Sequence, residues 1–302
     1  MCVKNGSKNT SSLGAATIYD GGDLNGRHVF LDSGGVRLHA LVWRPSVAKA
    51  QMILIHGLES NSAWFSNLGP RLAAKGYLVA AVDRPGSGLS GGRRGDMIDF
   101  AVLADHVRAV SRHIGEQLPA YVLGFSWGAR CALAHARRYP GDFRAIIVMA
   151  PGFRLRKPYS LLTRLYIAAA ACLHPSTLVR TPTAADESFT TRAIPLQFIR
   201  SDRQRISRVT ARMLLQSWKI DRLLFGRGSA VAVPLLHLIA GRDQICHNRH
   251  NSRLLRGLFA PADYTELVYP DADHALVFEC DRYDVAGDID GWVESVGSGG
   301  TS

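Results

Sequence analysis

Residues 121–128 read Tyr-Val-Leu-Gly-Phe-Ser-Trp-Gly, and this octapeptide constrains the fold more than any other part of the chain. Three apolar residues lead into Gly-x-Ser-x-Gly, and a helix-like segment follows from Ala129 to Tyr139. A serine on a sharp turn between a strand and a helix presents its hydroxyl above the sheet, where it can attack a carbonyl carbon. The flanking glycines suit this turn, because it leaves no room for Cβ atoms beside the serine. A glycine-rich turn with an incidental serine is disfavoured, because the partners of a nucleophilic serine follow in the expected order.

Strand-like and helix-like segments alternate along the first half of the chain. Strands apolar on both faces are expected at 51–56, 77–83, 121–125 and 144–150, and helices at 63–75, 100–117 and 129–139. This alternation predicts an α/β fold with a mostly parallel central sheet and helices on both faces. A hairpin around Ser33-Gly34-Gly35 is expected before these elements, and further strands at 233–240 and 264–269 after them.

The alternation stops between 152 and 230. Helices are expected there at 161–173 and 206–225, and four prolines divide the segment. A helical insertion after a sheet strand predicts a cap over the strand ends, where ligands bind in open α/β sheets. The expected organisation is therefore a core of 26–151 and 231–295 with a helical cap at 152–230. A flexible leader at 1–25 and a flexible tail at 296–302 are expected to flank it.

Positive charge is concentrated in the expected cap. The net charge of the chain is +11, and 152–230 holds fourteen Lys or Arg residues against four Asp or Glu. Either this segment is a solvated, arginine-rich surface, or it faces something anionic, such as an acidic carrier protein or an anionic membrane surface. Nucleic acid is disfavoured, because no recognised binding motif accompanies the charge.

Cysteine usage and hydropathy bear on the location of the protein. The five cysteines are odd in number and include no Cys-x-x-Cys pair, which disfavours a disulfide framework and a zinc site. Residues 1–25 lack the apolar region of a secretory signal, and the most apolar stretch, 167–173, is far shorter than the roughly 20 residues of a membrane span. These features predict a cytoplasmic protein, with peripheral membrane attachment left open.

A nucleophilic serine needs a base within hydrogen-bond reach and a third group that orients the base. In hydrolases with a serine on a strand-turn-helix, the chain order is serine, acid, histidine. Asp243 follows the expected strand 233–240, and His274 follows the strand that ends at Tyr269, so both are expected at the same sheet edge as Ser126. We predict that Ser126 is the nucleophile, His274 the base and Asp243 the orienting acid.

Other histidines and acids fit these roles less well. His247 and His250 follow Asp243 too closely to reach it from another loop. His106, His113 and His135 lie on expected helices. Asp271 and Asp273 are too near His274 in the chain to orient its ring, and Asp221 lies in the cap.

The charge that develops on the carbonyl oxygen needs preorganised N–H donors. The turn supplies the N–H of Trp127 at the start of its helix. The second donor is expected from the loop after strand 51–56, and we assign it to the N–H of Leu58, because Gly57 lets the backbone approach the substrate. The His56 side chain is expected to be structural. The glycine-rich segment 83–90 lacks the Lys-Ser/Thr ending and the third glycine of nucleotide-binding loops, so it is expected to be a structural turn.

Together these motifs resemble the α/β-hydrolase superfamily, and in particular its branch of monoglyceride lipases, lysophospholipases and S33 serine aminopeptidases. The resemblance runs from about Val36 to Val293. It rests on His56-Gly57, Asp83-x-Pro-Gly-x-Gly-x-Ser90, Gly124-x-Ser-x-Gly128, Gly241-x-Asp243, and His274 with Glu279 five residues on. It implies a triad of Ser126, Asp243 and His274, oxyanion donors at Leu58 and Trp127, and no cofactor.

The chain departs from the branch pattern in two places. Branch members usually have arginine, glycine and histidine in the loop where this chain has Arg84-Pro85-Gly86-Ser87. Trp127 stands where a small residue or Met is common, which is similar to proline iminopeptidases, but their Gly-Gly-Pro-Gly oxyanion loop is absent. Those enzymes bind a free amino terminus with cap carboxylates. The cap of this chain has few acids, and an aminopeptidase role is therefore disfavoured.

The sequence thus predicts a serine hydrolase that cleaves a carboxylic ester, with a lipid-like or small acyl group, through an acyl-enzyme. In the cap, Leu161, Leu162, Ile167 and 168–171 either line the acyl site or only pack their helix on the core. A thioesterase or acyltransferase with the same triad is an alternative, because only the leaving group and the acceptor differ. A ligand-binding protein without catalysis, and a non-hydrolytic biosynthetic enzyme, are further alternatives.

Overall fold

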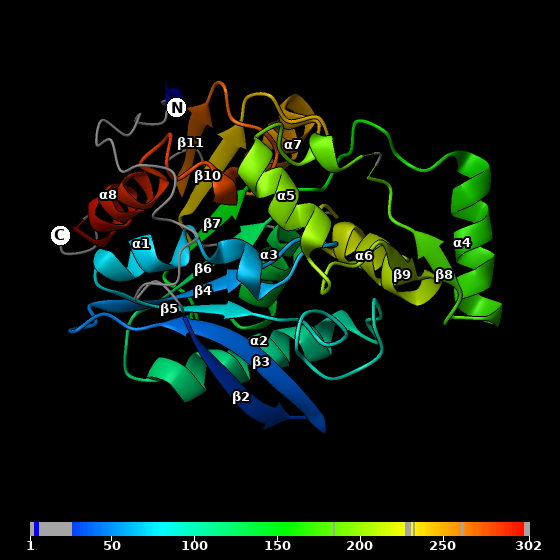
Figure 1. The fold of residues 1–302 in the computed structure, drawn as a ribbon, viewed down its shortest axis with the longest axis horizontal. Helices are drawn as coiled ribbons and strands as arrows, with labels where there is room; N and C mark the ends of the chain where they lie inside the picture. Colours follow the sequence, from blue (N-terminus) through cyan, green and yellow to red (C-terminus); the bar gives the residue numbers. More distant parts are fainter. Residues whose placement is uncertain are drawn as a thin grey trace.

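The computed structural model describes residues 3–5, 26–183, 185–226, 231, 233–260 and 263–298. Within these ranges the main sheet has nine strands in the order β1-β11-β10-β7-β6-β4-β5-β3-β2 (Figure 1). Neighbours from β1 to β5 in this order run parallel, and β3 and β2 join antiparallel at the far edge. The prediction of a mostly parallel sheet is confirmed.

The predicted strands after the entry hairpin lie within one or two residues of the observed bounds, and the first hairpin strand extends three residues beyond its predicted end at Phe30. The observed strands are β1 (Val3–Asn5), β2 (Arg27–Ser33), β3 (Val36–Trp43), β4 (Ala50–Ile55), β5 (Tyr77–Val82), β6 (Ala120–Phe125), β7 (Ala145–Met149), β10 (Leu235–Ala240) and β11 (Tyr264–Tyr269). In β4 to β7 and β10 every residue is buried, because both faces of the sheet are covered.

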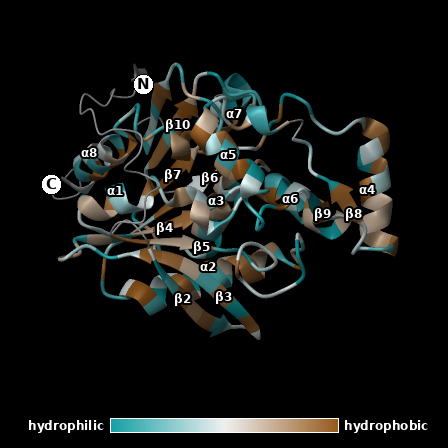
Figure 2. Cartoon of the chain, viewed as in Figure 1, coloured by the Kyte–Doolittle hydropathy of each residue, from teal (hydrophilic) through white to brown (hydrophobic). Residues whose placement is uncertain are grey.

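Helices cover the two faces of the sheet. Helices α2 (Phe100–Gly115) and α3 (Gly128–Arg138) pack together on one face, and α1 (Gly69–Ala74) and α8 (Val285–Ser298) pack together beside the other core cluster. Alternating side chains of β4 serve both cores, with Ile53 and Ile55 on the α2–α3 side and Met52 and Leu54 on the other. Figure 2 shows apolar residues concentrated on these strands.

The helix expected at 63–75 is divided. A short 3-10 helix, η2 (Ser62–Phe65), precedes α1, and Pro70 stands in the first turn of α1. Proline has no N–H to continue a preceding helix, but its fixed φ suits the first turn of a new one. Helix α7 (Asn248–Arg256) follows β10 and was not predicted.

The cap contains three α-helices and a small two-stranded antiparallel sheet in the described part of the chain. They are α4 (Leu161–Leu173), α5 (Ala193–Ser201), α6 (Ala211–Leu224), β8 (Leu178–Arg180) and β9 (Arg208–Thr210), with η3 (Asp186–Ser188) before α5. Helix α4 has its predicted bounds, whereas α6 begins at Ala211 rather than 206, because residues 208–210 pair with β8 and the Thr210 side chain caps the helix. Helix α6 packs on α3, and α4 packs on α6 at the edge farthest from the sheet (Figure 1).

Both ends of the described chain differ from the expected flexible segments. Residues Val3–Asn5 of the expected leader form β1 beside β11, and residues 6–25 lie outside the described residues. Helix α8 continues to Ser298, inside the expected tail, and 299–302 lie outside the described residues. Among the described helices, none combines the length and the apolar composition that crossing a bilayer requires.

Candidate active site

Ser126 occupies the strained turn that the sequence predicts between β6 and α3. Its φ of +53° lies in the left-handed region, which residues other than glycine seldom adopt. Its N–H donates to the Met149 carbonyl at 2.9 Å. A Cβ on Gly124 would lie 2.5 Å from the Gly128 oxygen, and one on Gly128 would lie 2.2 Å from the Ile55 oxygen. Both contacts are with backbone, so only glycine fits on either side of the serine.

The structure brings the three predicted triad side chains into one hydrogen-bonded line. His274 Nε2 lies 3.0 Å from Ser126 Oγ, and His274 Nδ1 lies 2.8 Å from Asp243 Oδ2. The other carboxylate oxygen of Asp243 accepts from the N–H groups of Ile245 and Cys246, at 2.8 and 2.7 Å. His274 and Asp243 are fully buried, so both are held in one orientation by protein groups rather than by water.

The rival acids and histidines have other partners. Asp221 forms a two-point ion pair with Arg130, Asp273 accepts from the N–H and hydroxyl of Thr191, and Asp271 pairs with Arg242. Among the histidines, His135 faces Asp142, and the rings of His247 and His250 lie 4.1 Å apart. Within the described residues none of these groups forms a hydrogen bond with the Ser126 hydroxyl.

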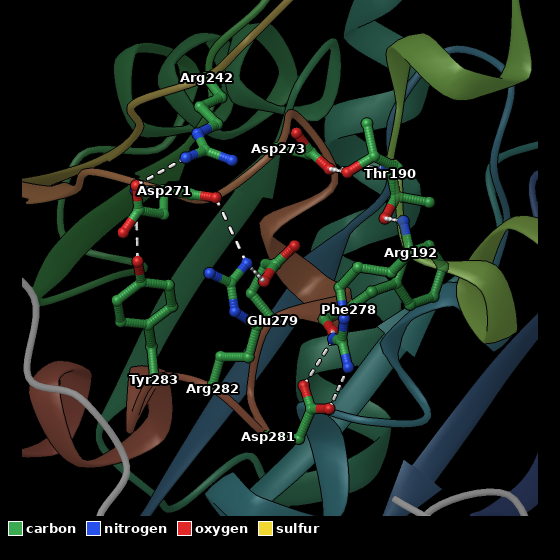
Figure 3. A network of polar contacts seen from close by, with 11 residues as sticks. Thr190, Arg192, Arg242, Asp271, Asp273, Phe278, Glu279, Asp281, Arg282 and Tyr283 are labelled. Atoms are coloured by element: carbon green, nitrogen blue, oxygen red, sulfur yellow. Dashed lines mark hydrogen bonds and ion pairs between the residues drawn. The ribbon is translucent and has the colours of Figure 1, made fainter.

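The loop that carries His274 is tied to the cap by a polar network (Figure 3). Asp273 bonds to Thr191 at 2.6 and 2.7 Å, and Arg192 donates to Asp281 and to the Phe278 carbonyl, each at 2.6 Å. Thr191 and Arg192 belong to the cap segment that precedes α5. The position of the imidazole is therefore coupled to the position of the cap.

The predicted oxyanion donors lie beside the serine. The N–H groups of Leu58 and Trp127 have no acceptor within the described part of the chain, and both residues line the cavity that reaches Ser126 and His274. A Cβ on Gly57 would lie 3.3 Å from the Ser126 Cβ, which shows how closely this loop approaches the nucleophile. Within the described residues, neither N–H group is therefore committed to a protein acceptor.

A cavity of about 290 Å³ lies between the cap and the carboxyl ends of the strands. Its apolar wall comes from both the cap and the core, and includes Phe125, Phe153, Leu155, Tyr159, Phe189, Leu214, Trp218 and Ile245. The interpretation that Leu161 and Leu162 line the acyl site is wrong, because these side chains are 70% and 79% exposed. Ile167 and Ala170 instead bury their side chains in the core, as the alternative predicts.

His56 and the 83–90 turn have the structural contacts that the sequence predicts. Burial and the charge of Arg84 lower the pKa of His56 to about 3, and this neutral ring bonds through Nδ1 to the Gly57 carbonyl at 2.8 Å. Burial would raise the pKa of Asp83, but hydrogen bonds from His39 and from backbone N–H groups lower it.

Asp243, His274 and Cys246 also bring three potential metal ligands within 4.8 Å of one another. Burial and the charge of Asp243 raise the pKa of the Cys246 thiol, so the thiolate that a metal requires is disfavoured. The carboxylate of Asp243 is already occupied by His274 and two backbone N–H groups. This donor set fits a hydrogen-bonded triad better than a metal site.

Sequence reasoning missed the arginine that links the nucleophile turn to the cap. Arg130 on α3 donates to Asp221 on α6 at 2.7 Å and to the Gly152 carbonyl at 2.6 Å, and the Gly152 N–H donates to the Ser126 carbonyl at 3.0 Å. The two ion-pair partners are 91 residues apart in the chain, so no local pattern connects them.

A hydrogen-bonded serine, histidine and aspartate at the carboxyl ends of a mostly parallel sheet, beneath a helical cap, define a hydrolase of the α/β-hydrolase fold. Residues 46–281 match the Hydrolase_4 family model, described as serine aminopeptidase, S33, and the chain belongs to this family.

Similar proteins extend over most of the chain. A monoacylglycerol lipase of Mycolicibacterium smegmatis is 26% identical over 283 residues, which cover 89% of this chain and 96% of that protein. A monoglyceride lipase of Homo sapiens is 27% identical over 270 residues, 82% of each chain. The crystal structure of a soluble variant of monoglyceride lipase from Saccharomyces cerevisiae, in complex with a substrate analog, has a TM-score of 0.78 at 17% identity. It covers 90% of this chain and 96% of that one, and this likeness concerns the fold.

Proposed function

We propose that the protein hydrolyses carboxylic esters through an acyl-enzyme on Ser126. The observation that carries this proposal is the line from Ser126 Oγ through His274 to Asp243, with contacts of 3.0 and 2.8 Å. In the first step His274 Nε2 accepts the serine proton while Oγ attacks the ester carbonyl carbon, and Asp243 stabilises the resulting imidazolium. The N–H groups of Leu58 and Trp127 donate to the oxyanion.

Collapse of the tetrahedral intermediate breaks the bond to the alcohol oxygen, which takes the proton from His274. Water then enters, gives a proton to the same nitrogen and attacks the acyl carbon. The second collapse releases the carboxylic acid and returns the proton to Ser126 Oγ. Each half-reaction uses the same base and the same two N–H donors.

The cavity favours an acyl ester over a peptide amino terminus. Its wall near Ser126 is rich in apolar and aromatic side chains, which suits a hydrocarbon chain. An aminopeptidase would need a free carboxylate for the substrate ammonium group. The carboxylates that line the cavity are Glu59 and Asp221, and each is paired with an arginine, Arg205 and Arg130 respectively. The names of the similar lipases support a monoacyl ester of glycerol as the first substrate to assay.

A substrate panel tests this proposal. We expect turnover of p-nitrophenyl esters of graded chain length and of monoacylglycerols, and no turnover of aminoacyl p-nitroanilides. Acyl thioesters form the third arm, because the same triad can cleave them. Faster cleavage of thioesters than of matched oxygen esters, or release of p-nitroaniline without ester cleavage, would overturn the assignment.

We further propose that the cap docks on an anionic lipid surface. Helix α4 lies at the edge of the molecule (Figure 2). It exposes the side chains of Leu161, Leu162, Leu165 and Leu173. Arg180 and Arg208 are exposed in the adjoining β8–β9 sheet, and neither forms an ion pair with a carboxylate of the described residues. An apolar face beside unpaired cations is typical of attachment to anionic membranes.

Serine substitutions on this face should separate membrane docking from catalysis. In an L161S/L162S/L165S variant, we expect binding to vesicles that contain phosphatidylglycerol to weaken by about tenfold or more. Each leucine that no longer inserts removes on the order of 1 kcal/mol of binding free energy. Hydrolysis of a short soluble ester should stay within about twofold of wild type, since α4 contributes only Arg164 to the cavity lining. Cosedimentation and p-nitrophenyl butyrate assays measure the two effects.

Val47→Ser is the matched control, because Val47 is exposed on the core, away from the cap. It should change neither readout. Unaltered vesicle binding in the triple variant would contradict lipid docking, and selective loss of activity on acyl groups attached to an acidic carrier would point to the carrier instead.

A further inference from the structure

We propose that Arg84 is a positioning residue that holds both oxyanion donors in place and adds a positive charge behind them. This inference rests on the proposed function, because it concerns the oxyanion of the same ester-cleavage reaction. Arg84 follows β5 and reaches beneath the loop that contains Gly57 and Leu58. Its side chain is not part of the triad. Among the described residues, it forms no hydrogen bond with Ser126, His274 or Asp243.

The first contact fixes the peptide that carries the Leu58 N–H. Arg84 Nη2 donates to the Gly57 carbonyl at 2.9 Å and to the Leu58 carbonyl at 3.0 Å. The Gly57 carbonyl and the Leu58 N–H belong to one planar trans peptide, so they point in opposite directions. A hydrogen bond that holds the carbonyl on the Arg84 side therefore holds the N–H on the other side.

The same carbonyl accepts a second hydrogen bond, from Nδ1 of His56 at 2.8 Å. A carbonyl oxygen has two lone pairs, and here both are used. The backbone N–H of Arg84 in turn lies 3.3 Å from Nε2 of His56, which acts as acceptor in the neutral ring. Arg84 and His56 thus form a closed set of contacts around one peptide group.

The second donor is braced by the flat face of the guanidinium. The Arg84 Cζ atom lies 4.6 Å from the centre of the Trp127 ring, within the range of a cation–π contact. On its far edge the indole Nε1 donates to Ser217 of α6 at 2.9 Å. The Trp127 side chain is therefore held between the core and the cap, and its backbone N–H is held with it.

The charge of Arg84 is buried and has no ion-pair partner among the described residues. The residue is 4% exposed, and no carboxylate lies within ion-pair distance. Burial lowers the pKa of Arg84 to about 10, which leaves it charged at neutral pH. A buried cation without a carboxylate is unfavourable for stability alone. It polarises the Gly57–Leu58 peptide and becomes better compensated when an oxyanion forms across that peptide.

The experiment compares Arg84→Ala and Arg84→Lys with wild type, using p-nitrophenyl butyrate and an alkyl boronic acid that forms a tetrahedral adduct with serine. For Arg84→Ala we expect kcat to fall about 10- to 100-fold, less than the ~10²- to 10³-fold loss typical of deleting an oxyanion donor. KM should change little, and boronate affinity should fall by the same factor as kcat/KM, because the contact stabilises the transition state. Arg84→Lys keeps the charge without the planar guanidinium, and its kcat should lie between those of wild type and Arg84→Ala.

Added methylguanidinium should restore part of the activity of Arg84→Ala, whereas urea, which has a similar shape and no charge, should not. Arg94→Ala is the matched control, because Arg94 also donates to backbone carbonyls, those of Gly88 and Gln204, away from the oxyanion loop. It should keep wild-type kcat. Thermal unfolding checks that each variant is folded, and Arg84→Lys carries the test should the alanine variant not fold.

Wild-type kcat in a folded Arg84 variant, or a loss that appears only in KM, or an unchanged boronate affinity, would overturn the inference. Absence of ester turnover in the wild-type protein would instead count against the proposed function, so the two failures are distinguishable.

Discussion

Replacement of Ser126 with alanine is expected to lower kcat/KM for ester substrates by about 10⁴- to 10⁶-fold, as loss of a nucleophile does in triad hydrolases. The Oγ atom 3.0 Å from His274 Nε2 is the group that forms the acyl bond, and no other hydroxyl contacts this imidazole within the described residues. Alanine accepts the φ of +53° about as well as serine, so the fold should be retained. Release of p-nitrophenol from a short ester measures the effect.

Ser207→Ala is a suitable control for this variant. Ser207 is exposed in the cap, and its backbone carbonyl, which the substitution leaves in place, accepts a hydrogen bond from the Thr181 N–H. We therefore expect kcat/KM to stay at the wild-type value. Activity of Ser126→Ala above a few per cent of wild type would place the nucleophile at another residue.

The second large effect is expected for Asp243→Asn, which should lower kcat by about 10⁴-fold. Asp243 Oδ2 accepts from Nδ1 of His274 and fixes the tautomer whose Nε2 can take the serine proton. The other oxygen already accepts two backbone N–H groups, so the asparagine would turn its NH₂ group toward the ring and favour the wrong tautomer. The pH-rate profile and kcat with a soluble ester provide the measurement.

Asp271→Asn and Asp273→Asn test the acids that lie nearest to His274 in the chain. Their carboxylates face Arg242 and Thr191, so we expect losses of less than about tenfold, from loop displacement alone. A collapse of activity in Asp273→Asn together with a mild effect of Asp243→Asn would reverse the assignment of the orienting acid.

The core and the triad could be predicted from sequence because their signals are local. Strand β4 is a continuous apolar run, and Ser126 lies in a turn whose glycines are dictated by backbone contacts at 2.5 and 2.2 Å. Asp243 and His274 each follow a buried strand directly, and parallel strands bring such positions to one edge of the sheet.

The cap could be predicted only in outline, because its details depend on contacts between distant segments. The apolar composition of α4 does not reveal which side faces the cavity, and Leu161 and Leu162 prove to face outward. The strands β8 and β9 have three residues each, too few for a periodic pattern. Helix α8 contains Gly287 and Gly291, which weaken the helical signal, and it is held by contacts with α1 and by side chains buried in the core cluster that it shares with the sheet.

The role of Arg84 was hidden for the same reason. In sequence it belongs to a glycine-rich turn, and nothing in that turn shows that its guanidinium lies under the Gly57–Leu58 peptide or over the Trp127 ring. Only the pairing of β4 with β5 and with β6 brings these three loops together.

Covalent labelling with an alkyl fluorophosphonate tests the central claim most directly, because the probe reacts with a serine hydroxyl only when a neighbouring base and an oxyanion site activate it. Mass spectrometry of the intact protein and of its peptides should show one adduct, on the peptide that contains Ser126. The adduct should be lost in Ser126→Ala and strongly reduced in a folded His274→Ala variant. An unlabelled wild-type protein, or an adduct on a different residue, would contradict the account.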